Sequence, residues 1–166
     1  MHHLEDFTDG ATFQLGTTAV VLEEVLAFGR RFDPQPFHTD PEAAARHSFG
    51  GIVASGWHTA ALCQRLFVDA LLVDVASLGG SGIDDVRFPR PVRPGDVLAA
   101  QARVLRTRPS EHKPDRGTVT FALTARNQRN ETVLTLELAV RCRRRGAEDH
   151  PTAIGAPIPR PSRRRV

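Results

Sequence analysis

The stretch SGWHTAALCQRLFVDALLV, residues 55–73, is the longest apolar run in the chain. Ser55 has the side chain of a helix cap, and the residues from Gly56 to about Val73 leave little polar surface on a helix. A helix that is apolar almost all round must be surrounded by other elements, and a curved sheet can do this. The run therefore predicts a long central helix inside a sheet.

The sequence after this helix predicts antiparallel strands. Residues 118–125 and 133–140 alternate apolar and polar side chains, and the polar stretch 127–130 between them is typical of a hairpin turn. Three further strands are expected over residues 11–21, 83–88 and 97–107, and a short helix over residues 22–31. The fold class is therefore α+β: an antiparallel sheet wrapped around one long central helix, with a loop and short-helix overhang before it.

Length and composition predict one domain, residues 1–145, followed by a Pro- and Arg-rich tail, residues 146–166. Hydrophobic residues make up 40% and charged residues 25% of the 166 residues, as in ordinary globular proteins. No apolar run approaches the length of a membrane span, and the N-terminus lacks a secretory signal, so we expect a cytoplasmic protein without a membrane partner. Cys63 and Cys142 are expected to be buried thiols.

The formal net charge of +3 is concentrated in arginines at residues 141–145 and 160–165. Nucleic acid is not the expected partner, because the chain lacks zinc-ligand spacing, a helix-turn-helix and aromatic residues interleaved with the basic ones. Solvated arginines that attract an anionic substrate are the preferred interpretation. A sheet that wraps one helix leaves an exposed edge, and we therefore expect a homodimer, or a higher homo-oligomer, formed through sheet pairing.

Chemistry is concentrated just before the central helix, where residues 33–38 read DPQPFH. Asp33 and His38 can hold a water between them, and a His–Asp pair in a partly dry pocket can exchange protons near neutral pH. The amide of Gly56 is one of the unpaired donors of a helix N-terminus and can stabilise a developing oxyanion. Each residue also has a structural explanation: Asp33 as a turn former, His38 as a loop-bonded side chain and Gly56 as a site of tight packing.

Residues 33–38 (DPQPFH), 49–56 (FGGIVASG) and 91–96 (PVRPGD) together resemble the MaoC-like (R)-specific enoyl-CoA hydratases of the hot-dog fold. The family's motif is an Asp, four residues and a His, with a Pro two positions before the His. Asp33, Pro36 and His38 match it, and Gly56 matches the glycine whose amide is the family's oxyanion donor. Many members carry Asn where this chain has Gln35, and His where it has Ser55.

The resemblance, which runs from about residue 12 to 144, implies a hot-dog domain, usually a homodimer, that acts on acyl-CoA thioesters. The expected activity is the reversible syn hydration of a trans-2-enoyl-CoA to an (R)-3-hydroxyacyl-CoA, without a metal or redox cofactor. Asp33, His38 and Gly56 are the predicted catalytic residues, and which of the first two is the base stays open. The predicted substrate-binding residues lie beside them in the sequence: Pro36, Phe37, Ser55 and Trp57.

Two other functions are compatible with the sequence. A hot-dog thioesterase would use a carboxylate, for which Asp33 is available, to direct water at the thioester carbonyl carbon. A non-catalytic acyl-CoA-binding subunit would keep the fold and lose turnover. Arg87, Arg90 and Arg93 are candidates to face the phosphates of coenzyme A, although solvated positions at a strand end explain them equally well.

Overall fold

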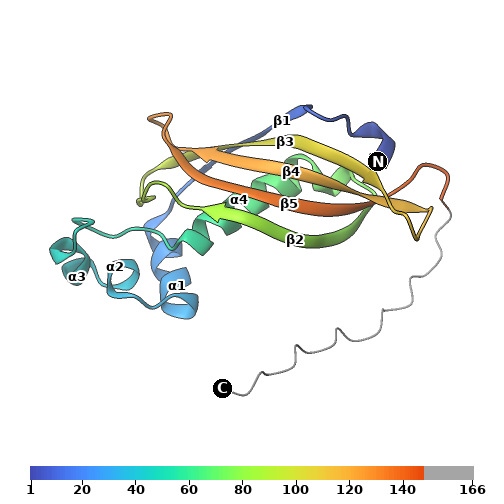
Figure 1. The fold of residues 1–166 in the computed structure, drawn as a ribbon. Coiled ribbons are helices and arrows are strands. Elements are labelled where there is room, and N and C mark those ends of the chain that lie inside the picture. Colours follow the sequence, from blue (N-terminus) through green and yellow to red (C-terminus); the bar gives the residue numbers. More distant parts are fainter. Residues whose placement is uncertain (148–166) are drawn as a thin grey trace, which may run out of the picture.

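The computed structural model describes residues 1–147, which form one antiparallel sheet curved around helix α4 (Gly56–Ala70) (Figure 1). The strand order is β1-β3-β4-β5-β2. The strands are β1 (Thr12–Ala19), β2 (Ser77–Arg87), β3 (Val97–Pro109), β4 (Arg116–Arg126) and β5 (Thr132–Arg143). The other helices are α1 (Leu22–Phe32), α2 (Pro36–Thr39) and α3 (Pro41–Arg46), with short 3-10 turns η1 (Leu4–Asp6) and η2 (Leu72–Asp74). The predicted α+β class, a sheet wrapped around one helix, is confirmed.

The hydrophobic core lies between α4 and the concave face of the sheet. The alternation read from the sequence places Phe121 of β4 opposite Leu138 of β5, and both side chains are buried. Phe67 of α4 contacts the Phe121 ring edge-on, with centroids 5.1 Å apart. Full burial of side chains of this size contributes about 1.5–3 kcal/mol each, so the strand pattern and the helix pattern stabilise one shared core.

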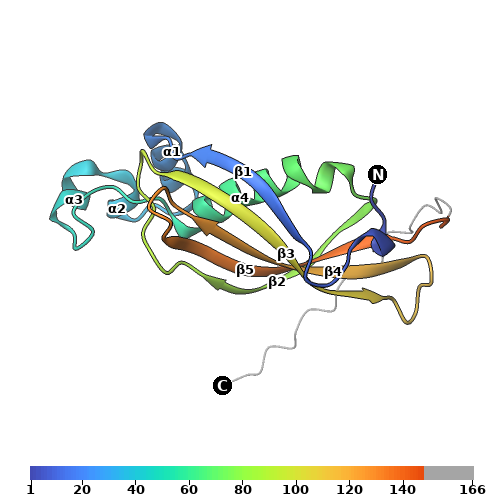
Figure 2. The ribbon, with the colours of Figure 1, turned by 90° about the horizontal axis from the view of Figure 1, so that it is seen from above.

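Helix α4 is covered by the sheet on one side only. Cys63 and Phe67 are buried, whereas Trp57 is 62% exposed and Val68 36% exposed. The expectation that the helix is surrounded is therefore confirmed for its sheet-facing side and wrong for the opposite side, which Figure 2 shows uncovered beside the sheet. Apolar residues on this open side leave a surface available for a partner or a ligand.

Strand β2 is longer than its sequence predicts. It begins at Ser77, whereas the sequence indicates a strand only from Ile83. The missed part, residues 77–82, is rich in glycine and has no alternation, and Gly79 has a φ of +95°. β2 is an edge strand whose pairing with β5 is interrupted by register shifts. An irregular, exposed edge does not require the side-chain pattern that identifies a half-buried strand.

Helices α1 to α3 form an overhang at the N-terminal end of α4 (Figures 1 and 2). The predicted short helix over residues 22–31 is α1. Over residues 33–49 the sequence predicts a loop with one helical turn, and the structure has two short helices there, each with a proline at its start. Asp40 caps α3 by accepting the amides of Glu42 and Ala43 at 2.9 and 3.1 Å.

Both cysteines are buried thiols, as predicted, and burial raises the pKa of Cys63 to about 12 and that of Cys142 to about 11. None of the helices in residues 1–147 has the length and hydropathy needed to cross a bilayer. Of the predicted tail, residues 146–166, only the first two residues are among those described.

Candidate active site

Asp33 and His38 are brought together by the turn between α1 and α2. Asp33 ends α1, with its amide bonded to the Gly29 carbonyl at 2.9 Å, and Pro36 opens α2. Helix α2 has only four residues, and the His38 side chain within it points toward Asp33. The His38 Nε2 and Asp33 Oδ2 atoms are 3.4 Å apart. The convergence on which the predicted chemistry depends is present.

The Asp33 carboxylate accepts hydrogen bonds on both oxygens. Gln35 Nε2 donates to Oδ1 at 2.8 Å, and the Ser55 hydroxyl donates to Oδ2 at 2.7 Å. These donors, Ser55 first and then Gln35, hold the pKa of Asp33 below its usual value, and His38 adds to the effect. Asp33 is therefore an anion at neutral pH, held in a fixed orientation.

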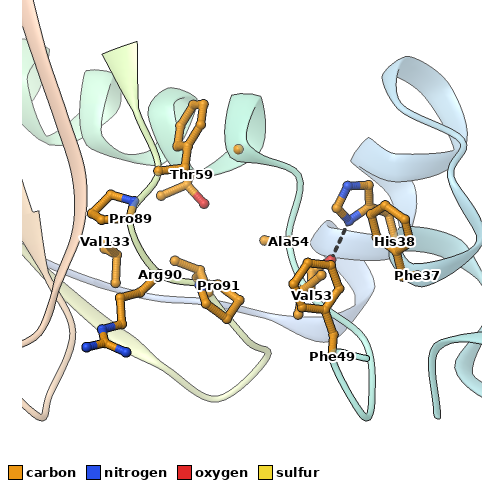
Figure 3. A pocket seen from close by; sticks show the side chains of 13 residues that line it. Phe37, His38, Phe49, Val53, Ala54, Thr59, Pro89, Arg90, Pro91 and Val133 are labelled. Carbon is orange, nitrogen blue, oxygen red and sulfur yellow. Dashed lines mark hydrogen bonds between the residues drawn. The ribbon is translucent and has the colours of Figure 1, made fainter. Parts of the chain in front are cut away.

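His38 is buried, with 6% of its surface exposed. Its Nδ1 lies 2.7 Å from the carbonyl oxygen of Val53, which can only accept, so Nδ1 carries a proton (Figure 3). In the neutral ring, Nε2 then presents a lone pair toward the Asp33 carboxylate. Two acceptors 3.4 Å apart require a proton between them, supplied either by Nε2–H or by a bridging water.

Gly56 is the first residue of α4. The Ser55 side chain caps the helix by accepting the Trp57 amide at 3.3 Å. Within residues 1–147, the Gly56 amide donates no hydrogen bond. It is a donor at the positive end of a helix of 15 residues, and a carbonyl oxygen can accept from it.

The space around Gly56 also supports the structural explanation for its lack of a side chain. A Cβ built on it would lie 2.7–2.9 Å from three ring atoms of Phe88. Contacts this short do not occur, so the Phe88 ring occupies the space of the missing side chain. Glycine at this position therefore allows the close approach of Phe88.

A cavity of about 380 Å³ lies between α2 and the start of α4. His38 and Gly56 both line it, and Figure 3 shows His38 beside Phe37 and Phe49, across the cavity from Arg90, Pro91 and Val133. Its walls are mostly apolar. The lining residues are Phe37, His38, Phe49, Val53, Ala54, Gly56, Thr59, Phe88, Pro89, Arg90, Pro91, Val92 and Val133. This volume lies within the range of ligand pockets, and the few polar groups converge as a binding site requires.

The predicted site residues occupy different places around this cavity. Asp33 does not line the cavity, and its carboxylate lies beside His38, which does. Phe37 lines it. Ser55 is 1% exposed and does not line the cavity; its hydroxyl donates to Asp33 and caps α4. Pro36 is exposed at the start of α2, and Trp57 lies on a neighbouring groove.

The three arginines considered from the sequence have separate positions. Only Arg90 lines the cavity, and it pairs with Glu131 at 3.7 Å. Arg87 pairs with Asp85 at 2.6 Å, and the Arg93 guanidinium donates to the carbonyl of Phe49. Arg90 is thus the one of the three arginines that lines the cavity. No three His, Cys, Asp or Glu side chains within residues 1–147 are grouped so that they could bind a metal ion.

The contributors that sequence reasoning missed include Gly29, Thr59, Phe88 and Val133. Thr59 of α4, Phe88 just beyond β2 and Val133 of β5 line the cavity. A Cβ on Gly29 would lie 2.7 Å from the His38 carbonyl oxygen, so Gly29 lets α2 pack against α1. Only Gly29 carried a signal, because an isolated glycine within a helical pattern often marks close backbone contact.

The family profile described as "MaoC like domain" matches residues 10–127 of this chain. The chain belongs to this family. The match covers β1, the overhang, α4 and the strands through β4, and therefore contains Asp33, His38 and Gly56.

Known proteins of the MaoC-like fold agree with this assignment. The MaoC-like dehydratase from Rhodospirillum rubrum is 41% identical, with a TM-score of 0.80 over 87% of this chain and 99% of that one. The R-hydratase PhaJ1 from Pseudomonas aeruginosa is 25% identical, with a TM-score of 0.66 over 92% and 96%. The 3-hydroxyacyl-thioester dehydratase Z of Mycobacterium tuberculosis is 38% identical over 52% of this chain and 58% of its own length. The hot-dog fold is thereby shown.

Proposed function

We propose that this protein is a hydratase/dehydratase that interconverts a trans-2-enoyl-CoA and an (R)-3-hydroxyacyl-CoA. The observation that carries the proposal is that His38 and Gly56 line the same mostly apolar cavity, with the Asp33 carboxylate 3.4 Å from His38 Nε2. The neighbours named as dehydratases and an R-hydratase support this reaction class. The thioester in the name of the Mycobacterium tuberculosis relative supports the substrate class.

In the proposed reaction, the thioester carbonyl oxygen accepts a hydrogen bond from the Gly56 amide. Negative charge develops on that oxygen as water attacks C3, and a donor of this kind lowers the barrier by about 3–4 kcal/mol. The mostly apolar walls strengthen the interaction by excluding bulk water. The charge is lost again when C2 takes up a proton.

The Asp33–His38 pair would hold the attacking water. One member removes a proton as the water oxygen bonds to C3, and the other donates a proton to C2, so that the pair ends with the same number of protons. Asp33, with two donors on its oxygens and a lowered pKa, is suited to enter the reaction ionised beside a protonated His38, and the proton that it takes from the water passes to His38 afterwards. Delivery of OH and H from one side gives syn addition, and reversal gives dehydration.

The test is hydration of crotonyl-CoA and longer enoyl-CoAs by the purified protein, followed as loss of enoyl absorbance. Asp33→Asn, His38→Ala and the double variant should each lose at least about 100-fold in kcat/KM. Asp69→Asn and His112→Ala are matched controls, because both residues are exposed and lie outside the cavity. Full activity in the double variant would end the proposed mechanism. Thiol release without loss of enoyl absorbance would instead identify a thioesterase.

We also propose that two copies pair through β2, whose outer edge has no neighbouring strand within residues 1–147. Ile83 on this strand is 57% exposed, which suits a contact between copies. Sedimentation should give a dimer, and Ile83→Lys should weaken it; a monomeric wild-type protein would exclude this pairing. The cytoplasmic location and the absence of a metal or redox cofactor stay predictions.

A further inference from the structure

A polar hollow of about 310 Å³ lies at the hairpin between β3 and β4, at the end of the sheet away from helices α1 to α3 (Figure 1). We call it the hairpin hollow. None of its lining residues, all of which lie within residues 1–147, is acidic. The lining includes three cations and two hydroxyl groups, those of Lys113, Arg116, Arg141, Ser110 and Thr118.

The hairpin hollow is separate from the catalytic cavity. The stretch of β5 from Val133, which lines the cavity, to Arg141, which lines the hollow, is about 27 Å long at the rise of a strand. The neighbours of Arg141 in the strand, Val140 and Cys142, are buried in the core, whereas Arg141 is exposed. Its side chain therefore extends from the face of the sheet opposite the core, and the hydration proposed above does not use it.

Positive charges of neighbouring strands lie on both sides of Thr118. In the strand register, Thr118 of β4 is opposite Arg108 of β3 and also opposite Arg141 of β5. Side chains directly opposite each other project from the same face, so the two arginines flank the Thr118 hydroxyl from strands about 10 Å apart. The two positive charges repel each other, and an anion between them would replace this repulsion by attraction.

The charge of the hairpin hollow is only partly balanced. Arg116 is paired, because its Nε lies 3.0 Å from both carboxylate oxygens of Asp115. Within residues 1–147, Arg108, Lys113 and Arg141 form no ion pair. Lys113 and Arg141 therefore leave two positive charges in the lining without a counter-ion. A phosphate monoester carries a charge of about −2 near neutral pH and would balance them.

Backbone hydrogen bonds hold the hairpin in a defined shape. The Ser110 amide donates to the Arg116 carbonyl at 3.0 Å, and the Arg116 amide donates to the Lys113 carbonyl at 3.3 Å. The Ser110 hydroxyl accepts the Lys113 amide at 3.2 Å. The backbone that carries these side chains is therefore ordered before a ligand arrives, which reduces the entropy that binding must remove.

We propose that the hairpin hollow is a binding site for the phosphate group of a small phosphorylated molecule. The Arg141 guanidinium and the Lys113 ammonium bind phosphate oxygens, and both are usual phosphate ligands. The Thr118 hydroxyl, which has no hydrogen-bond partner within residues 1–147, donates to a further oxygen. The donors surround one hollow instead of following a line along the surface, so the site fits one phosphate group better than an extended polyanion.

The experiment measures the binding of phenyl phosphate to the full-length protein by calorimetry at constant ionic strength. Benzenesulfonate, which has the same ring and one negative charge fewer, is the comparison ligand. We expect one phenyl phosphate per chain, bound at least about tenfold more tightly than benzenesulfonate. Neither ligand can be hydrated, so the result is independent of the proposed enzyme activity.

Three variants test the lining. Arg141→Gln and Lys113→Gln should each weaken phenyl phosphate binding by at least about tenfold, because each removes a charged hydrogen-bond donor. Thr118→Val keeps the shape of the side chain and every charge, and should weaken binding by about threefold through loss of the hydroxyl alone. Circular dichroism checks that each variant is folded.

Two further variants are controls. Arg103→Gln removes the same charge from an exposed position of β3 that does not line the hollow, and Arg90→Gln removes the cation that lines the catalytic cavity. Both should bind phenyl phosphate as the wild-type protein does. Equal weakening in Arg103→Gln and Arg141→Gln would show general attraction to a basic protein, and a loss confined to Arg90→Gln would place the ligand in the catalytic cavity.

Two other results would also overturn the proposal. Phenyl phosphate that does not saturate, or that binds no better than benzenesulfonate, would show that no phosphate site is present. A single-stranded DNA oligonucleotide that binds far more tightly than phenyl phosphate, and loses affinity in Arg103→Gln as well as in Arg141→Gln, would identify an extended nucleic-acid surface in its place. Saturable binding that is lost in Arg141→Gln and Lys113→Gln and kept in both controls would establish the site.

Discussion

Gly29→Ala is the substitution whose outcome depends most directly on the geometry of the site. In an ordinary helix this change stabilises, because alanine has the higher helix propensity, by about 1 kcal/mol. Gly29 is buried in α1 against α2, and a Cβ there would lie 2.7 Å from the His38 carbonyl oxygen and 3.1 Å from the His38 and Thr39 side chains. The backbone oxygen cannot turn away as a flexible side chain can.

The steric cost should exceed the propensity gain. Ordinary contact with a Cβ begins near 3.4 Å, so α2 must retreat by about 0.7 Å. Overpacking of this kind costs about 1–3 kcal/mol, which leaves a net loss of up to about 2 kcal/mol in the free energy of unfolding. The same movement would pull the His38 ring away from Val53 O and from Asp33, which now lie 2.7 and 3.4 Å away. A misplacement approaching 1 Å lowers kcat/KM by about 10–100-fold.

Urea unfolding and enoyl-CoA hydration measure the two effects on the same protein. Ala27→Gly is the control: it lies exposed in the same helix, so it should cost about 1 kcal/mol through propensity alone and leave kcat/KM unchanged. A Gly29→Ala protein that is more stable than wild type and fully active would refute the close contact between α1 and α2. The packing of α2 on α1 would then no longer account for the position of His38.

Three further outcomes follow from the polar contacts. Ser55→Ala removes the donor to Asp33 and the side-chain cap of α4, so the free energy of unfolding should fall by about 1–3 kcal/mol. Because the pKa of Asp33 rises, the acid limb of the pH profile of kcat/KM should move to higher pH. Ser55→Thr should restore both properties. Gln35→Glu places a second carboxylate beside Asp33 and should move that limb the same way, whereas Gln35→Leu, which only removes a donor, should move it less. Burial lowers the pKa of His58 below 6.5, so the unfolded state binds more protons than the folded state as the pH falls. The stability contributed by the neutral ring is therefore present above about pH 6.5 and lost as the pH falls toward the lowered value. Urea midpoints between pH 7 and 5 should accordingly fall less in His58→Phe than in wild type.

The sequence was sufficient wherever one face of an element is buried. β4 and β5 alternate because Phe121 and Leu138 are buried in the core, whereas Ala122, Glu137 and Ala139 on the other face are only half-buried, and α4 itself was evident from its apolar length. The first half of β2 was not evident from the sequence, because residues 77–82 lie in an edge strand and are mostly exposed. Solvent imposes no period on such a strand, so no local pattern could have revealed it.

Part of the site was local in the sequence and part was not. Asp33 and His38 are joined by a single turn, so the motif that contains them predicted that they meet, whereas the hydrogen bond from Gln35 to Asp33 was not predicted. Phe88, just beyond β2, and Val133 of β5 reach the cavity from parts of the chain that are distant in sequence, and their own sequence surroundings say only that they are apolar. Which strand end lies opposite the start of α4 is decided by the strand order, and single-sequence patterns do not contain it.

The two glycines Gly29 and Gly56 determine distances in the site that the hydrogen bonds alone would not fix. Gln35, Ser55 and the Val53 carbonyl orient Asp33 and His38, yet each of these contacts could survive a small shift of the overhang. Gly29 fixes how closely α2 approaches α1, and Gly56 fixes how closely Phe88 approaches the amide at the start of α4. A methyl group at either position would keep every polar atom and still separate the proton-transfer pair from the carbonyl site or change the shape of the cavity. The spacing of this site is therefore a packing property, and variants that retain all its donors and acceptors can lose its chemistry.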